Sequence, residues 1–415
     1  MTATRSICSA LMALLALSTI AIGQGRESVL YSFGANQNDG NTPNGDLLFD
    51  AAGNIYGTAP YGGANNGGIV FELSPTGNGN WTETILHDFC LSNCMDGASP
   101  SGGLVVDSVG NFYGLTMRGG TYGSGTFFEL SPPTKPGTAW TETVFWNFGS
   151  NHYVETPIGR LVWGPGGSLF GATEEGGAGL GSVFELTLNQ GGGWSESDLY
   201  AFCKNGPPCT DGAEPMAGVT FDQAGDLYGT TEAGGFKSQW GVVYQLKPVD
   251  GGWTETTLHT FSPVGGGGGH PLCQVSIDPS GNLYGTVYEG GRNSGQCGGV
   301  WKLAPQTGGT FKAESLPFNC SDPFGPSAPA AGVLLDPKTK GAFGTSYGGG
   351  EFGYGGTLYR IMGNRSSVVY SFCQQTNCTD GAGPTTPLTA HGAALYGTTS
   401  GGGAFNKGIV FSVAP

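Results

Sequence analysis

The chain has 415 residues, of which 79 are glycine and 25 are proline, so these two types make up about a quarter of it. Only 11% of the residues are Asp, Glu, Lys or Arg, against about 25% in ordinary globular domains, which excludes disorder driven by charge repulsion. The net charge of −15, with no basic cluster, excludes nucleic acid as a partner. The 23 Phe, 16 Tyr and 8 Trp residues suffice to fill a core.

The N-terminus has the pattern of a secretory signal peptide. Arg5 precedes an apolar run from Ala10 to Ile22, and small residues around Gly23 form a cleavage site. The run is shorter than the roughly 20 apolar residues that a membrane-spanning helix needs, and no later stretch is long and apolar enough. We therefore expect a signal peptide over residues 1–23, a mature chain over residues 24–415, and secretion to the periplasm or the extracellular space.

A tandem repeat accounts for the mature chain. Each copy contains an aromatic residue, then glycine, then Thr or a small or apolar variant, and the seven glycines are Gly57, Gly114, Gly171, Gly229, Gly285, Gly344 and Gly397. A proline lies 13 to 15 residues before each glycine: Pro43, Pro100, Pro157, Pro215, Pro271, Pro329 and Pro384. The glycines of the chain therefore have a period, which indicates turns in a repeat protein rather than low complexity.

Each copy contains four short β-like runs. In the second copy these are residues 103–107, 111–116, 125–130 and 140–148, and Gly110 closes a tight turn between the first two. No run shows the 3.6-residue period of a helix. Four strands repeated seven times predict an all-β, seven-bladed β-propeller with four strands per blade. A β-helix is the main rival, but it uses shorter rungs and more uniform side-chain ladders.

The two ends of the mature chain complement each other. Residues 28–33 (Ser-Val-Leu-Tyr-Ser-Phe) match the fourth strand of a copy, whereas residues 408–413 (Gly-Ile-Val-Phe-Ser-Val) match the third. The last blade therefore lacks its outer strand, and the N-terminus carries a spare one. We expect the N-terminal strand to complete the last blade, which closes the ring and removes two exposed sheet edges.

The repeat resembles the GloVer tandem repeat of exported bacterial proteins. The resemblance is carried by Tyr-Gly-Thr-Thr at residues 228–231 with Gly-Gly at 234–235, and by Gly-Ile-Val-Phe-Glu-Leu-Ser-Pro at residues 68–75. It covers essentially the whole mature chain. The resemblance implies an exported β-repeat protein, and it implies no particular reaction.

The longer and more variable loops of a blade lie on one face, which is where binding sites usually occur. Four of the loops between blades carry Asp-Gly-x-x-Pro, with the aspartates Asp39, Asp96, Asp211 and Asp380. These residues have two interpretations: an Asx-type turn that fixes the start of the inner strand, or a ring of ligand-binding carboxylates. Because no Asp-x-Asp-x-Asp loop occurs, we expect no metal site and no cofactor, with a bound Ca²⁺ kept as an alternative.

Aromatic residues on the same face are suited to binding sugar or peptide, because flat rings offer contact area at little rotamer entropy. Half of them are expected to pack against neighbouring blades instead. The ligand-binding candidates are Tyr61, Tyr122, Phe236, Trp240, Tyr288 and Tyr347. Glu174, Glu232 and Glu289 occupy similar positions in consecutive blades. They are the weak candidates for the two carboxylates of a glycoside hydrolase.

Nine cysteines remain after cleavage of the signal peptide. Three predicted disulfides each lie within one loop between blades: Cys90–Cys94, Cys203–Cys209 and Cys373–Cys378. Cys273 and Cys297 lie in the fifth blade and can pair, which would leave Cys320 over, and the sequence leaves the pairing of these three cysteines open. The Cys-x-x-Cys spacing of a zinc site is missing.

These features favour a secreted, monomeric β-propeller that acts as a non-catalytic binding or scaffold module for glycan or extracellular protein. One alternative is an exported carbohydrate-active hydrolase or lyase with acidic residues at the mouth of the central channel. Another is a cation-stabilised adhesion protein. We therefore expect a binding function rather than catalysis, and the ligand itself is not encoded in any motif.

Overall fold

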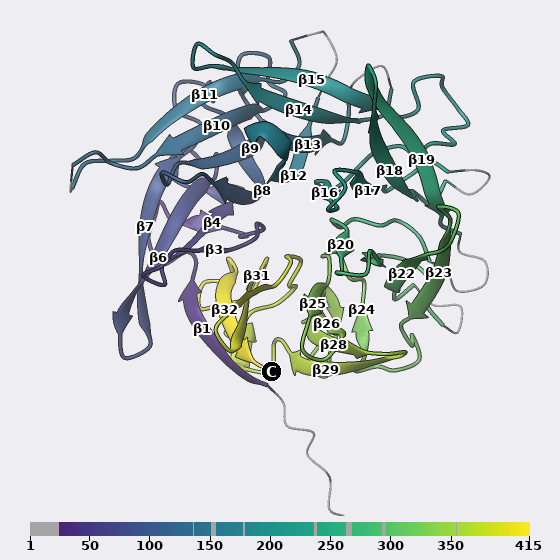
Figure 1. The fold of residues 1–415 in the computed structure, drawn as a ribbon. Coiled ribbons are helices and arrows are strands. Elements are labelled where there is room, and N and C mark those ends of the chain that lie inside the picture. Colours follow the sequence, from purple (N-terminus) through teal and green to yellow (C-terminus); the bar gives the residue numbers. More distant parts are fainter. Residues whose placement is uncertain are drawn as a thin grey trace, which may run out of the picture.

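The structure is a computed structural model that describes residues 25–135, 137–150, 155–176, 179–235, 239–262, 268–292, 296–353 and 355–415. The predicted signal peptide, Phe236 and the Gly-rich residues 263–267 lie outside the described residues. The described chain forms seven four-stranded antiparallel sheets, which are arranged in a ring, as Figure 1 shows. The predicted seven-bladed β-propeller is therefore confirmed. No helix among the described residues is long and apolar enough to cross a membrane.

The first four blades follow the chain, and each is built from the inside of the ring outward. Their strands are β3 (Leu48–Phe49), β4 (Ile55–Ala59), β6 (Ile69–Gly77) and β7 (Asn80–Asp88) in blade 1; β8 (Ala98–Val106), β9 (Phe112–Arg118), β10 (Thr126–Ser131) and β11 (Thr141–Asn147) in blade 2; β12 (Pro157–Trp163), β13 (Leu169–Thr173), β14 (Ser182–Leu188) and β15 (Trp194–Ala201) in blade 3; and β16 (Thr220–Phe221), β17 (Leu227–Thr231), β18 (Val242–Val249) and β19 (Gly252–Thr260) in blade 4.

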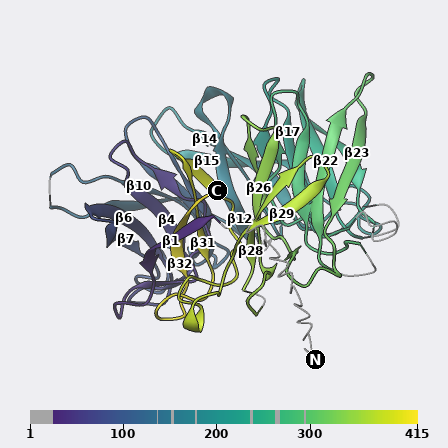
Figure 2. The ribbon, with the colours of Figure 1, turned by 90° about the horizontal axis from the view of Figure 1, so that it is seen from below.

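The remaining blades repeat the same order. Their strands are β20 (Ser276–Ile277), β21 (Leu283–Val287), β22 (Gly299–Pro305) and β23 (Phe311–Pro317) in blade 5; β25 (Leu334–Asp336), β26 (Gly341–Ser346), β28 (Thr357–Met362) and β29 (Arg365–Ser371) in blade 6; and β30 (Thr389–His391), β31 (Ala394–Thr399), β32 (Ile409–Ala414) and β1 (Arg26–Ser32) in blade 7. Figure 2 shows the ring from the side, with β17, β22 and β23 running between its two faces.

Short elements lie in the loops of the ring. Two-residue ladders pair β2 (Gly40–Asn41) with β5 (Tyr61–Gly62) and β24 (Pro326–Ser327) with β27 (Gly348–Gly349). The single-turn 3₁₀ helices η1 (Pro165–Gly167) and η3 (Thr376–Cys378) are the helical elements of the described chain whose bounds are defined. The four β-like runs expected in the second copy correspond to β8 to β11, and β8 begins earlier than predicted.

The N-terminal strand closes the ring, as the ends of the sequence predict. β1 pairs antiparallel with β32, from Arg26 opposite Ala414 to Ser32 opposite Ile409. In Figure 1 the purple β1 lies against the yellow β32. The backbone N–H of Phe33 also donates to the carbonyl of Gly408 at 3.0 Å. Blade 7 is thus assembled from the two ends of the described chain.

The repeat glycine provides room for the aromatic ring of the third strand. A Cβ added at any of the seven glycines would overlap or crowd this ring. The rings are Phe71, Phe128, Phe184, Tyr244, Trp301, Tyr359 and Phe411, all of them buried. This contact is made inside each blade, and the rings then fill the hydrophobic clusters between neighbouring blades. Glycine is required here for a close approach, not for a positive φ.

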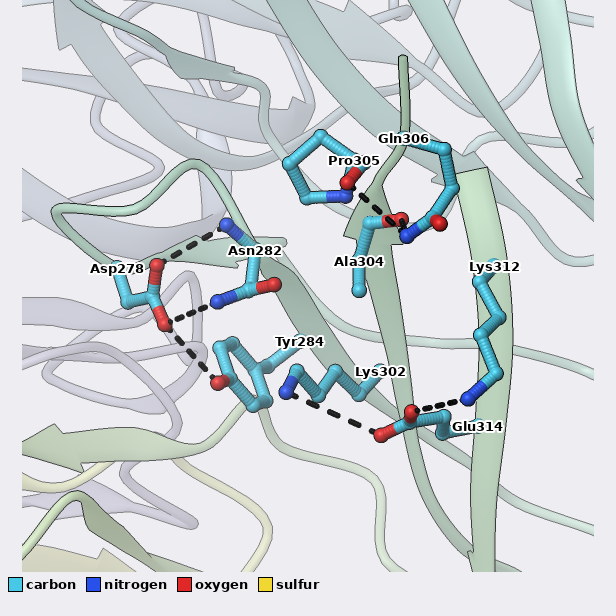
Figure 3. A network of polar contacts seen from close by, with 9 residues as sticks. All are labelled: Asp278, Asn282, Tyr284, Lys302, Ala304, Pro305, Gln306, Lys312 and Glu314. Carbon is cyan, nitrogen blue, oxygen red and sulfur yellow. Dashed lines mark hydrogen bonds and ion pairs between the residues drawn. The ribbon is translucent and has the colours of Figure 1, made fainter. Parts of the chain in front are cut away.

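The aromatic residue before the repeat glycine binds the tight turn of its own blade. In blade 5 the Tyr284 hydroxyl donates to Asp278 at 3.0 Å, and the Asn282 side chain donates to the same carboxylate at 2.7 Å (Figure 3). Equivalent Tyr–Asp bonds occur in blades 1, 2 and 4. The recurring Asp-x-x-Gly-Asn sequence is therefore explained as an Asx turn that the next strand caps.

In five of the seven blades a threonine follows the repeat glycine and bonds the blade to the next one. Its hydroxyl donates to a carbonyl of the following inner strand, for example from Thr230 to Cys273 at 3.0 Å and from Thr286 to Ala331 at 2.9 Å. The same bond crosses the closure of the ring, from Thr398 to Pro43 at 3.1 Å. The three residues of Tyr-Gly-Thr therefore act together. The tyrosine hydroxyl bonds the tight turn, the glycine leaves room for the aromatic ring of the third strand, and the threonine hydroxyl bonds the next blade.

Carboxyl groups also meet between blades. Tyr31, in the outer strand of blade 7, donates its hydroxyl to Asp39 at 2.9 Å and to Glu83 of blade 1 at 3.0 Å. Burial and the adjacent Asp39 carboxylate raise the pKa of Glu83 to about 8. In blade 3, burial with Asp198 and Glu155 nearby raises the pKa of Glu196 to about 8.

Three more outer-strand glutamates follow the same pattern. Burial raises the pKa of each to about 7, and each has an interblade aspartate among its charged neighbours: Glu27 with Asp380, Glu142 with Asp96, and Glu255 with Asp211. For Glu142, the imidazole of His87 opposes the increase. The interblade carboxyl pairs therefore hold protons at a pH where exposed glutamates have lost them.

Four disulfides are present, which is typical of proteins in oxidising compartments. The three predicted local pairs, Cys90–Cys94, Cys203–Cys209 and Cys373–Cys378, are confirmed. Of the three cysteines whose pairing the sequence leaves open, Cys297 pairs with Cys320, and Cys273 is free and buried.

The reason for this pairing is the position of each cysteine in its blade. Cys273 lies at the channel, where its sulfur accepts from the backbone N–H of Thr286 at 3.2 Å. Cys297 and Cys320 both lie in the outer loops beside Gly291. Cys320 lies two residues after Phe318, close to the place of the first cysteine of each local pair, which comes directly after its own phenylalanine. This near-equivalence was the signal that sequence reasoning missed.

Removal of the closing strand tests the ring closure. Deleting residues 24–34 leaves β32 as an unpaired edge and exposes the interface of blades 7 and 1, so we expect a large decrease in the melting temperature and aggregation on heating. Thermal unfolding followed by circular dichroism measures this. An unchanged melting temperature would contradict the closure.

Substitution of the repeat glycine tests its close approach to the aromatic ring. In Gly285→Ala the new methyl group overlaps the Trp301 ring, and we expect a loss of about 1–3 kcal/mol in the free energy of unfolding, as in other overpacked cores. Gly191→Ala is the matched control, because nothing lies within 4 Å of its Cβ position. Equal stability of the two variants in urea unfolding would refute the interpretation.

The interblade carboxyl pairs predict a characteristic pH dependence. Their folded-state pKa values, about 7–8, exceed the ordinary value of 4.5, so the folded state binds more protons and the free energy of unfolding decreases as pH rises from about 4.5 to about 8. Burial lowers the pKa of His259, which acts in the opposite direction. The double variant Glu83→Gln/Glu196→Gln isolates the effect, and we expect a flatter stability profile in that range. A profile identical to that of the wild type would contradict it.

Candidate functional site

The mouth of the central channel is formed by two residues from each blade. One directly precedes the repeat proline, and the other lies three residues after the repeat glycine. In blades 3 to 7 the backbone N–H of the second residue donates to the carbonyl of the first, for example from Glu174 to Thr156 and from Glu232 to Glu214, both at 2.8 Å. The backbone of the mouth is therefore regular, and only its side chains vary from blade to blade.

The residue before the proline has a left-handed backbone in six of the seven blades. The φ values are 59° at Thr42, 56° at Ser99, 58° at Glu214, 54° at His270, 53° at Ala328 and 64° at Gly383. This conformation is uncommon for residues other than glycine, and it concentrates at functional sites. The mouth thus contains five non-glycine residues whose backbone is strained.

The side chains make the mouth asymmetric. Blades 3 to 5 contribute groups that we call the acidic arc. These are Glu174, Glu214, Glu232 and His270 at the two mouth positions, and Glu289, which directly follows the mouth residue Tyr288. The two mouth positions of blades 7, 1 and 2 carry small or uncharged residues: Gly383, Ser400, Thr42, Pro60, Ser99 and Met117. At the two mouth positions, acidic groups and histidine therefore occur only in blades 3 to 5.

The groups of the acidic arc interact with one another. Burial raises the pKa of Glu174, and the nearby Glu175, Glu232 and Glu214 carboxylates raise it further. Burial also raises the pKa of Glu232, which His270 partly offsets. The Nδ1 atom of His270 lies 3.8 Å from Oε1 of Glu232.

An aromatic residue lies beside the arc. The ring of Trp240 is 4.8 Å from that of His270, at 55°, and it covers Gly269, where a Cβ would overlap the indole. Trp240 is half-buried, since it also packs on the cluster that contains Phe261 and Trp301. Tyr288 is half-buried as well, and its backbone N–H donates to the His270 carbonyl at 3.1 Å.

The other predicted aromatic candidates are spread around the ring. Tyr347 of blade 6 is 51% exposed and lies against Gly383 of blade 7. Blade 6 follows blade 5, so Tyr347 lies beyond the end of the acidic arc. Tyr61 and Tyr122 are 46% and 55% exposed, but they belong to blades 1 and 2. Phe236 lies outside the described residues. The structure thus brings Trp240, Tyr288 and the three candidate glutamates to consecutive blades, and it places Tyr61 and Tyr122 elsewhere.

The four Asp-Gly-x-x-Pro aspartates lie inside the interblade loops. Asp39 is 2% exposed and accepts from Tyr31 and from the backbone N–H groups of Gly34 and Gly40. Three further contacts follow the same pattern: Asp380 accepts from Tyr370, Asp211 accepts from Tyr200, and Asp96 lies 3.3 Å from His87. These contacts support the interpretation as loop-fixing turns.

Sequence reasoning missed one member of this set. Glu155, 7% exposed, accepts from the backbone N–H of Gly149 at 2.9 Å and so takes the same place in the loop between blades 2 and 3. Its position two residues before Pro157, rather than four, concealed the equivalence.

A cavity of about 330 Å³ occupies the channel just inside the mouth. Its lining comes from all seven blades and includes an ion pair between Arg160 of blade 3 and Asp46 of blade 1, with Nη1 at 2.9 Å from Oδ2. Sequence reasoning missed this pair as well, because 114 residues separate its members. Among the described residues, no group of three or more His, Cys, Asp or Glu side chains is arranged to hold a metal ion.

Comparisons with known structures find the same fold at low sequence identity. The polysaccharide lyase Uly1 is 10% identical with a TM-score of 0.51, over 93% of this chain and 92% of that one. A PL25 ulvan lyase bound to -[GlcA(1-4)Rha3S]- is 8% identical with a TM-score of 0.53, over 93% and 95%. PorZ, a surface component of the type-IX secretion system of Porphyromonas gingivalis, is 14% identical with a TM-score of 0.50, over 93% and 48%. The chain thus spans about half the length of PorZ.

No curated protein matches the chain in sequence. The family model of the Gloeobacter/Verrucomicrobia repeat matches residues 16–220 and, again, residues 159–411. The two matches together cover nearly all of the repeats that form the blades, which confirms the family resemblance of the sequence motifs. The chain is therefore a member of the Gloeobacter/Verrucomicrobia repeat family.

Proposed function

We propose that this protein is an exported module that binds glycan at the channel mouth, across the acidic arc and the aromatic rings beside it. The observation that carries the proposal is the convergence of the acidic arc with Trp240 and Tyr288 on consecutive blades. Carboxylates accept hydrogen bonds from sugar hydroxyls, and aromatic rings offer flat contact surfaces at low entropic cost. The four disulfides support export.

The charge of the site selects among glycans. Four glutamates lie at the mouth of a chain whose formal net charge is −15, so a polyanion is repelled. The structure of the PL25 ulvan lyase, which has a similar fold, is bound to -[GlcA(1-4)Rha3S]-, a ligand with acidic groups. The acidic arc is unfavourable for such a ligand. It favours neutral glycans, or glycans with amino groups.

A second candidate function is hydrolysis of the bound glycan. The raised pKa of Glu174 and of Glu232 favours it, because a glycoside hydrolase needs one carboxylic acid that keeps its proton and one carboxylate that has lost it. Glu289 lies in the next blade, and its carboxylate contributes to the raised pKa of Glu232. A lyase function fits the site less well than a hydrolase function, because elimination by a lyase acts on acidic sugars and the acidic arc repels these sugars.

A glycan array tests the binding function. We expect labelled wild-type protein to bind neutral or amino glycans, and we expect Trp240→Ala/Tyr288→Ala to lose at least about tenfold in affinity, or about 1.4 kcal/mol. Leu188→Ala is the control, since this residue is 57% exposed at the hairpin on the opposite face. Circular dichroism confirms that each variant is folded. Binding restricted to sulfated or uronate glycans would contradict the proposal.

Release of reducing sugar from the bound glycan tests hydrolysis. If hydrolysis occurs, Glu232→Gln removes a carboxyl group of the arc, and we expect it to lower the rate at least about a hundredfold while binding is kept. Glu351→Gln, in a loop of blade 6, is the control variant. Undiminished hydrolysis by Glu232→Gln would exclude Glu232 as a catalytic group.

A further inference from the structure

The channel cavity is built from one short stretch of every blade. Its lining consists mainly of residues one to three positions after each repeat proline, from Asn44 and Asp46 in blade 1 to Thr385 and Pro387 in blade 7. Met117, a residue of the mouth, also lines it. The cavity therefore lies next to the mouth, and it reaches the mouth at Met117 of blade 2.

The walls of the cavity are rigid where blades 1 to 4 meet. A Cβ at Gly45 would overlap the backbone of Gly102, one at Gly102 would overlap Gly159, and one at Gly159 would overlap Gly218. The four inner strands thus touch through their backbones, with no side chain between them. A cavity bounded by touching backbones keeps its shape, which lowers the entropic cost of binding.

The charges in the cavity compensate each other. Arg160 and Asp46 form an ion pair across the inner strand of blade 2, where Gly103 leaves room beside both side chains. The other polar lining residues, Asn44, Ser101, Gln274 and Thr385, are uncharged. The lining therefore offers no unpaired charge to an ionic ligand.

Two residues of the lining each carry a polar side-chain atom that has no partner among the described residues. Oδ1 of Asn44 and Nε of Arg160 are both buried and make no hydrogen bond within the protein. One is an acceptor and the other is a donor. A ligand that satisfies both needs donors and acceptors without charge, and hydroxyl groups are both. Ile158, Met216 and Leu272 supply apolar surface to the same cavity, and mixed lining of this kind is usual in ligand pockets.

We propose that the channel cavity is a subsite for the terminal unit of an uncharged polyhydroxylated chain, so that the propeller binds the end of a glycan rather than its middle. The proposal rests on the glycan-binding function assigned to the mouth. The cavity of about 330 Å³ is at the lower end of the size range of ligand pockets, roughly 300–1,000 Å³. Walls from seven blades surround it, so a linear chain can enter it only by an end.

Isothermal titration calorimetry with defined oligosaccharides tests the subsite. The probes are cellohexaose, mannohexaose, maltohexaose and chitohexaose, which are linear and uncharged. We expect at least one of them to bind the wild type. Asn44→Leu removes the unpartnered acceptor, and Ala330→Phe fills the cavity from blade 6, and we expect each to lower the affinity for that probe at least about tenfold. Ala52→Phe, in an exposed turn on the opposite face, is the matched control.

The outcomes separate this inference from the function on which it rests. If a hexasaccharide binds and Trp240→Ala weakens it while Asn44→Leu and Ala330→Phe do not, the mouth binds glycan and the channel subsite is refuted. If none of the four probes binds the wild type, both proposals fail for neutral chains. Maltohexaose and its cyclic counterpart α-cyclodextrin give a further comparison. Because α-cyclodextrin has no chain end, equal affinity for α-cyclodextrin and maltohexaose would refute the recognition of a chain end.

Discussion

The contact on which the structure depends is that of an aromatic ring against the α-carbon of a glycine. The ring comes from the third strand and the glycine from the second, and the contact recurs in all seven blades. Any side chain on the glycine would push the third strand away, so the ring would no longer reach the cluster between blades. The same short motif adds a tyrosine hydroxyl bond to the tight turn in four blades and a threonine bond to the next blade in five. Blade shape and blade spacing thus have a common origin.

The regular backbone explains how one side of the mouth is specialised. Since the same N–H to carbonyl bond recurs from blade 3 to blade 7, a side chain can change without disturbing the ring. Blades 3 to 5 use this freedom for Glu174, Glu232 and His270, whereas blades 7, 1 and 2 carry small or uncharged groups. The left-handed residues before the prolines donate their backbone N–H to a carbonyl of the preceding blade, for example from His270 to Trp240 at 3.0 Å. Function in such a ring depends on differences between copies, and stability depends on what the copies share.

The interblade contacts also show why carboxyl groups are retained inside a glycine-rich, weakly charged protein. Asp39 fixes its loop with backbone N–H groups, and the Tyr31 hydroxyl bridges it to Glu83 of the neighbouring blade. A protonated glutamate in this place can share a hydrogen bond with the carboxylate, whereas an ionised one repels it. The same groups that set the loop geometry thus make the ring sensitive to pH, and they do so at several interfaces.

The sequence by itself determined the number of blades, their strand order and the closure by the N-terminal strand, because these follow from a period and from the complementary ends of the chain. It also determined the three local disulfides, whose members are close in sequence. The tertiary structure alone decided the Cys297–Cys320 pair, the Asp46–Arg160 pair in the channel and the convergence of the acidic arc. The reason is that a repeat specifies how each copy folds, whereas partners from different copies meet only when the ring has closed.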